Sequence, residues 1–74
     1  LGFPVTMDEG SPFAGKTLGE LDLTDINVRV TAVRRNNIRG FDPGPETRLE
    51  AGDSLILLGL PDDLMLAEAR INRS

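Results

Sequence analysis

The stretch LEAGDSLILLG, residues 49–59, combines a Gly-Asp step with the most apolar segment of the chain. The run at residues 54–58 is too short for an independent helix, and a short apolar run bounded by turn residues is typical of a buried strand. Gly52 can adopt backbone angles that other residues avoid, and the Asp53 carboxylate can accept hydrogen bonds from nearby backbone amides. We therefore predict a structural turn at Gly52 and Asp53 that leads into a central buried strand.

The segment before this turn, NVRVTAVRRNNIRGF at residues 27–41, has the pattern of a β-hairpin. Apolar residues at positions 28, 30 and 32 alternate with Arg29, Thr31 and Val33, and residues 38–41 provide a return strand. Asn36 and Asn37 tolerate the positive φ that a two-residue type I′ turn requires at both central positions. The return strand should end at DPGPE, residues 42–46, because two prolines and a glycine interrupt the ladder.

The remaining segments predict an edge strand and two helices. Phe3, Val5 and Met7 alternate with polar residues or proline, and Pro4 cannot donate to a ladder, so this strand should lie at an edge. Thr17 and Glu20 have the spacing of a capping box, which predicts a short helix. Pro61 suits the first position of a closing helix. The residues expected on the buried face of that helix are Leu60, Leu64, Ala67 and Ile71.

Together these elements predict an α+β fold. It is a small four-stranded, mainly antiparallel sheet with two helices, in the order β-α-β-β-β-α. A chain of 74 residues supports one core, so we predict a single domain over residues 1–74. Because the chain begins with Leu1 and strand-like residues, we expect it to be a segment of a longer polypeptide. Without cysteines, self-association is the expected additional stabiliser.

Composition argues against several classes of function. The formal net charge is −4, with 8 Lys and Arg against 12 Asp and Glu, which disfavours a nucleic-acid surface. We therefore predict that nucleic acid is not a partner. The longest apolar run, residues 55–58, is far shorter than the roughly 20 residues of a membrane-spanning helix.

The chain also lacks the residues that most catalytic sites need. It contains no His, Cys, Tyr or Trp, and its three serines have no plausible general base, so we predict that it is not an enzyme. The acidic pairs at residues 8–9 and 62–63 do not supply the six to eight oxygens of a calcium site. A module that responds to a metal ion stays open as an alternative function.

The succession GKTLGELDL (residues 15–23), VRVTAVRRNN (28–37), Pro43, LEAGDSLILLG (49–59) and a final amphipathic helix resembles the TrkA C-terminal domain. This family is also called RCK-C, the C-terminal domain of regulators of potassium conductance. The resemblance covers roughly residues 5–71. Asn36 and Asn37 replace the acidic residue and glycine that many members have at the hairpin tip.

This resemblance implies a regulatory domain at the cytoplasmic face of the cell membrane. Its hosts would be potassium channels, potassium uptake systems or cation/proton antiporters. Members of the family commonly form homodimers and bind a small effector, which is cyclic di-AMP in some branches. We therefore expect a domain that gates transport through ligand-biased dimer geometry.

The hairpin and the loop after it are the strongest candidate for an effector site. The arginines can hold a phosphate, the asparagines can read a polar ring edge, and the apolar side chains can provide a floor. The candidate effector-binding residues are Val33, Arg34, Arg35, Asn36, Asn37, Ile38 and Pro43. Two alternatives stay open: the arginines only balance an acidic surface, or the domain is a constitutive dimerisation scaffold without an effector.

Overall fold

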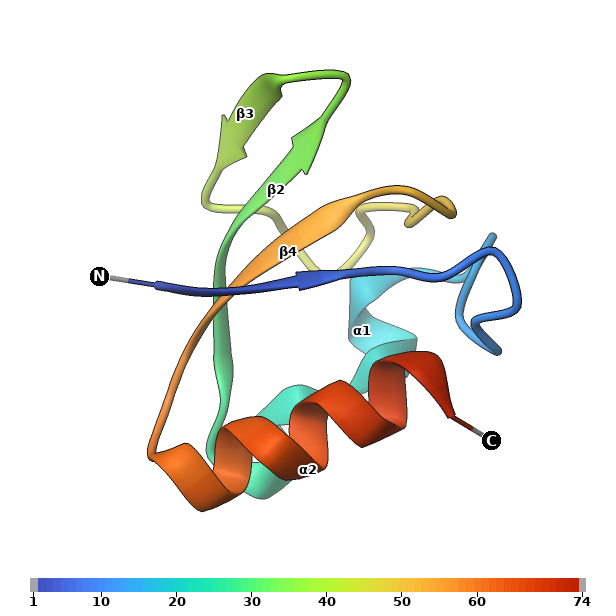
Figure 1. Ribbon diagram of the computed structural model, residues 1–74. Helices are drawn as coiled ribbons and strands as arrows, with labels where there is room; N and C mark the ends of the chain where they lie inside the picture. The colour runs from blue at the N-terminus through green and yellow to red at the C-terminus, as the bar shows by residue number, and fades with distance from the viewer. Residues whose placement is uncertain (1, 74) are drawn as a thin grey trace.

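The fold is a four-stranded antiparallel sheet with helix α2 packed on one side (Figure 1). The computed structural model describes residues 2–73. The strand order in the sheet is β1-β4-β2-β3, and all three pairings are antiparallel. The strands are β1 (Phe3–Thr6), β2 (Arg29–Arg35), β3 (Ile38–Phe41) and β4 (Ser54–Leu58), and the helices are α1 (Leu18–Leu21) and α2 (Pro61–Asn72). The predicted α+β class and the predicted order of elements are confirmed.

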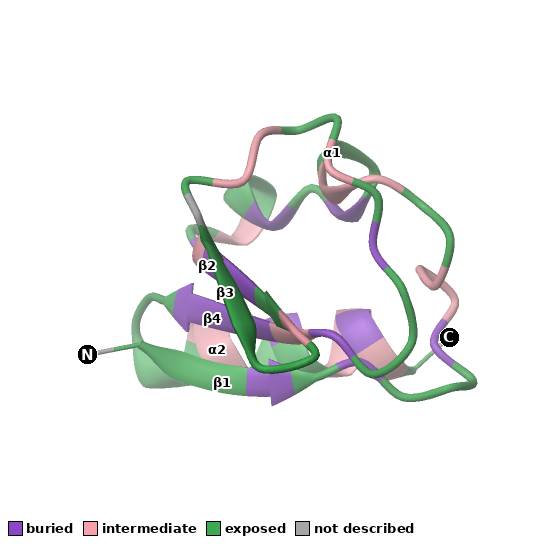
Figure 2. Cartoon of the chain, turned by 90° about the horizontal axis from the view of Figure 1, so that it is seen from above, coloured by how far each residue is buried: buried purple, intermediate pink, exposed green. Residues whose placement is uncertain are grey.

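Strand β4 lies in the middle of the sheet, as its apolar sequence predicts. Leu55 pairs with Val5 of β1 and with Val33 of β2, so these three side chains share one face of the sheet. Leu55 and Leu57 are fully buried and belong to the same core cluster as Ile71 of α2. Figure 2 shows the burial concentrated along β4, whereas residues 38–40 of β3 are exposed.

Strand β1 occupies one edge of the sheet, in agreement with the prediction from Pro4. This proline is the Cα partner of Ile56 in β4, and no strand pairs with the other side of β1 within residues 2–73. A missing backbone donor is tolerated at such an edge. Asn72, at the end of α2, links the helix to the end of β1. Its side chain accepts a hydrogen bond from the Asp8 amide (2.8 Å) and donates one to the Thr6 carbonyl (3.0 Å).

Helix α1 has the predicted capping box. The Thr17 hydroxyl accepts from the Glu20 amide, and the Glu20 carboxylate accepts from the Thr17 amide, both at 3.3 Å. The chain then turns through Asp22, with φ of 49°, into a 3₁₀ helix (Leu23–Ile26). No helix was predicted at these residues from the sequence, so this short helix was missed.

One residue of the closing helix was placed wrongly. Leu60 was predicted on the buried face of α2, but it is 71% exposed. It is the N-cap residue and has extended backbone angles, φ −77° and ψ 154°, so it lies outside the helical repeat. Ala67 and Ile71 are buried as predicted, and Leu64 packs against the core.

Candidate functional site

The β2–β3 hairpin builds one wall of the candidate site. Asn36 and Asn37 have φ of 52° and 64°, the left-handed values that a type I′ turn needs. The register pairs Arg35 with Ile38 and Val33 with Gly40. Because residues opposite one another in an antiparallel pair share a face, these four residues lie on the same side of the hairpin.

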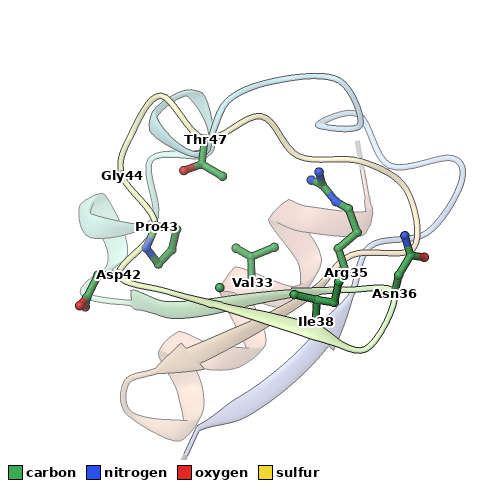
Figure 3. Close-up of a pocket in the computed structure, with 9 residues that line it drawn as sticks. Val33, Arg35, Asn36, Ile38, Asp42, Pro43, Gly44 and Thr47 are labelled. Carbon is green, nitrogen blue, oxygen red and sulfur yellow. The ribbon is translucent and has the colours of Figure 1, made fainter.

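A pocket of about 500 Å³ lies between this side of the hairpin and the loop that follows β3 (Figure 3). Val33 is nearly buried at its floor, whereas Ile38 is 74% exposed at its rim. Figure 3 places Arg35 and Asp42 at opposite ends of the pocket. The lining residues are Val33, Arg35, Asn36, Ile38, Gly40, Asp42, Pro43, Gly44 and Thr47.

The structure brings together five of the seven residues that the sequence singled out: Val33, Arg35, Asn36, Ile38 and Pro43. Arg34 and Asn37 do not line the pocket. Arg34 is the cross-strand partner of Arg39, on the face of the hairpin opposite to Arg35. Two adjacent strand residues cannot both face one pocket, so the alternation of β2 separates the two arginines.

The far wall of the pocket was missed by the sequence analysis. It consists of Asp42, Gly44 and Thr47, which surround Pro43 in the loop after β3. Of the DPGPE segment, only Pro43 was among the candidate residues, and the glycine and second proline indicated only that β3 ends. The same residues prevent the loop from pairing, which leaves its side chains and backbone available to line a cavity.

Arg35, which lines the pocket, forms an ion pair with Asp53. Arg35 Nε donates to Asp53 Oδ1 at 2.8 Å, and Arg35 Nη2 donates to Asp53 Oδ2 at 2.7 Å. The Glu50 amide also donates to Asp53 Oδ2, at 2.9 Å, which confirms the predicted backbone contact of this carboxylate. The turn depends on Gly52, whose φ is +91°. Sequence analysis predicted this turn but not its contact with Arg35.

Asp53 is fully buried, yet it carries a charge. Burial opposes ionisation, but the hydrogen bonds from Arg35 and from the Glu50 amide, together with the arginine's charge, hold the pKa of Asp53 below its ordinary value. The hydrogen bond to Asp53 in turn raises the pKa of Arg35. The pocket wall therefore carries a permanent cation whose position is fixed by a buried carboxylate.

This arrangement suits a ligand that is partly apolar and partly anionic. Val33, Ile38 and Pro43 offer apolar contact, Asn36 offers an amide, and Arg35 offers positive charge. Within residues 2–73, no three His, Cys, Asp or Glu side chains gather closely enough to hold a metal ion. Over the same residues, no helix is long and apolar enough to span a membrane.

The family profile of the TrkA-C domain matches residues 4–72. The chain belongs to the TrkA-C domain family. The resemblance predicted from the motifs is therefore confirmed over nearly the whole chain. A search of curated proteins gives no significant match.

Solved structures similar to this TrkA-C domain include two complexes with cyclic di-AMP. The RCK C domain of the potassium transport protein KtrA is 28% identical, with a TM-score of 0.83 over 93% of this chain and 80% of that chain. The RCK_C domain dimer of S. agalactiae BusR is 25% identical, with a TM-score of 0.77 and coverage of 88% of each chain. Both structures contain cyclic di-AMP.

A third similar structure corrects the prediction that nucleic acid is not a partner. It is S. agalactiae BusR in complex with its busAB-promotor DNA, 25% identical, with a TM-score of 0.78 over 86% of this chain. This TrkA-C domain spans only 32% of that BusR chain. The exclusion rested on the net charge of 74 residues, which sets no limit on the charge of a longer protein that contains such a domain.

Proposed function

We propose that this TrkA-C domain is an effector-binding, dimerising module that regulates a longer protein, and that its effector is a cyclic dinucleotide, with cyclic di-AMP as the first candidate. The observation that carries the proposal is the pocket beside the β2–β3 hairpin, which combines an apolar floor with the Arg35 cation. The cyclic di-AMP complexes of the similar KtrA and BusR domains support the choice of ligand.

Each part of the pocket matches one part of such a ligand. Val33, Ile38 and Pro43 would contact a purine ring, and the Asn36 amide would read its polar edge. Arg35 would face a phosphate, since its guanidinium already lies in the wall. The candidate roles of Arg34 and Asn37 stay predictions, and both would have to act from outside the pocket lining.

The symmetry of the ligand supports a homodimer as the acting form. Cyclic di-AMP consists of two identical halves, and a two-fold dimer presents the same pocket twice. The BusR domain that is similar to this chain is a dimer in complex with that ligand. An effector that prefers one dimer arrangement over another would shift the population of the two, and only by the difference in affinity.

The host protein that we propose is a cation transporter, channel or antiporter with this domain at the cytoplasmic face of the membrane. KtrA, a potassium transport protein, supports such a host. The promoter complex of BusR supports a second kind of host, a regulator bound to DNA. We expect no catalysis by this domain in either case, and that expectation stays a prediction.

Calorimetric titration of the 74-residue domain with cyclic di-AMP tests the proposal, with cyclic di-GMP and AMP as comparison ligands. We expect saturable binding of cyclic di-AMP near one ligand per two chains, with weaker binding of the other two. At a hundred times the dissociation constant, the ligand should stabilise the fold by about 2.7 kcal/mol. Absence of binding in a folded domain would contradict the proposed effector.

A constitutive dimerisation scaffold is the second candidate, and one observation favours it. Met65 and Leu66 on α2 are 69% and 56% exposed and do not line the effector pocket. Such apolar surface is a natural contact between copies whether or not a ligand is present. Saturable binding of cyclic di-AMP separates the two candidates, because a constitutive scaffold would dimerise but would bind no effector.

A further inference from the structure

The contacts of the Arg35 guanidinium divide its nitrogens into two groups. An arginine has five N–H donors, one on Nε and two on each terminal nitrogen. Nε and Nη2 make three short hydrogen bonds, to the two Asp53 oxygens (2.8 and 2.7 Å) and to the Arg48 carbonyl (2.9 Å). Among residues 2–73, Nη1 has one charged partner, the Glu50 carboxylate, at 3.3 Å.

The two carboxylates that hold Arg35 differ sharply in burial. The Asp53 side chain is 1% exposed, whereas that of Glu50 is 62% exposed. An exposed ion pair contributes little to stability, and its partner can exchange it for water or for another anion. Asp53 therefore fixes the position of the guanidinium, while the contact with Glu50 is replaceable.

We propose that Glu50 competes with the effector for Arg35. In the free domain the Glu50 carboxylate holds Nη1, and on binding it yields this nitrogen to an anionic group of the ligand. Arg35 lines the pocket but Glu50 does not, so the exchange would free Nη1 for the ligand while Asp53 keeps the guanidinium in place. Glu50 would then set the affinity of the pocket for anionic ligands without contacting them. This inference rests on the proposed function, because it assigns a role within the same site.

The charges around the pocket make this competition significant. Among the lining residues, the Arg35 cation is matched by one carboxylate, that of Asp42 at the opposite end. At the arginine end itself, the ionised Asp53 carboxylate already balances the Arg35 charge, so the additional carboxylate of Glu50 makes the sum of these three charges negative and opposes a phosphate. Removing the Glu50 charge should strengthen the attraction of a phosphate to Arg35. Salt should reduce this effect, because it screens the charges.

The test is calorimetric titration of cyclic di-AMP into the wild-type domain, Glu50→Gln and Glu68→Gln. Glutamine keeps the size of the side chain and leaves the Glu50 backbone amide free to bond Asp53. Glu68 is exposed on α2 and provides the same change of charge outside the pocket lining. We expect Glu50→Gln to bind about three- to tenfold more tightly than wild type at 50 mM salt, and Glu68→Gln to bind within about twofold of wild type.

Two further measurements separate competition from a structural effect. The gain of Glu50→Gln should shrink at 500 mM salt, and binding of adenosine, which has no phosphate, should not change. Glu50→Ala, which removes the acceptor as well as the charge, should bind cyclic di-AMP at least as tightly as Glu50→Gln. Both variants should unfold at the wild-type temperature within a few degrees, since the side chain is exposed.

The outcomes distinguish this inference from the function on which it rests. If wild type binds cyclic di-AMP and the Glu50 variants bind equally or more weakly, competition is wrong and the proposed function stands. If neither wild type nor the folded variants bind, both are wrong. Tighter binding by the two Glu50 variants, with Glu68→Gln unchanged, supports both.

Discussion

Asp53 and Arg35 close the end of the sheet through two side-by-side hydrogen bonds, 2.8 Å from Nε to Oδ1 and 2.7 Å from Nη2 to Oδ2. The last Cα partners of β2 and β4 are Arg34 and Ser54, so this contact lies one residue beyond the ladder at the pocket end. Paired charged hydrogen bonds of this geometry are stronger than neutral ones. The same contact therefore ends the sheet and positions the cation of the pocket.

We expect Asp53→Asn to destabilise the domain by about 2–3 kcal/mol, because the amide cannot accept all three hydrogen bonds and leaves Arg35 without its buried counter-charge. Urea unfolding followed by circular dichroism measures the loss. The matched control is Asp25→Asn, since the Asp25 side chain is 64% exposed and lies 3.4 Å from Arg70. That change should cost less than about 0.5 kcal/mol. Similar losses in the two variants would contradict the special role of Asp53.

The stability contributed by Asp53 should depend on pH in one direction. Its folded pKa lies below its ordinary value, so the unfolded chain takes up the proton first as the pH falls. The contribution is fully present above the unfolded pKa of about 3.9 and is lost as the pH falls through the folded pKa. We would measure urea unfolding of wild type and Asp53→Asn at pH 7, 5, 4 and 3. The difference between their free energies of unfolding should be constant from pH 7 downward and should become smaller below about pH 4. A difference that stays constant to pH 3 would overturn this account.

Gly52 should be the glycine whose backbone conformation matters most for the turn before β4. Its φ is +91°, and a Cβ at this position would meet no atom within 4 Å, so alanine would add backbone strain alone. We expect Gly52→Ala to cost about 1–2 kcal/mol in thermal or urea unfolding. Gly10→Ala is the control, because a Cβ there also meets nothing within 4 Å and the backbone is not in the left-handed region. Gly10→Ala should be neutral or slightly stabilising. Equal losses of stability in the two variants would contradict backbone strain at Gly52.

Ile38 should affect binding rather than folding. It is 74% exposed at the rim of the pocket, so Ile38→Ser should change the unfolding free energy by less than about 0.5 kcal/mol. Loss of its apolar contact should weaken cyclic di-AMP about tenfold in the calorimetric titration. Leu60→Ser is the control, since Leu60 is 71% exposed and does not line this pocket. An equal effect of both variants on affinity would place the ligand elsewhere.

The fold was readable from the sequence because its signals are local. The alternation around Pro4, the Asn36-Asn37 turn, the capping box of Thr17 and the apolar run of β4 each act within a few residues. Leu60 was misplaced for a related reason, because the helical spacing includes it although the helix begins one residue later. The 3₁₀ helix lacks such a pattern, since left-handed residues at Asp22 and Asn27 define it.

The site was only partly readable, because its decisive contact is not local. Arg35 and Asp53 are separated by 18 positions, and the sequence gives no spacing rule that would join them. Strict alternation along β2 does predict that Arg34 and Arg35 face opposite sides, and that inference was available before the structure. The far wall could not be derived, because the course of a loop rich in proline and glycine depends on tertiary contacts.

The double use of Arg35 has a consequence for how such a domain can diverge. A change at Arg35 that adjusts recognition of an effector also removes the partner of a buried carboxylate, so most such changes would unfold the chain before they alter its specificity. Ile38 is exposed and has no comparable structural role, whereas Asn36 is exposed but must keep the left-handed φ of the turn. New ligand preferences should therefore arise first at the hairpin tip, while the arginine persists as an inherited constraint even in a descendant that binds nothing.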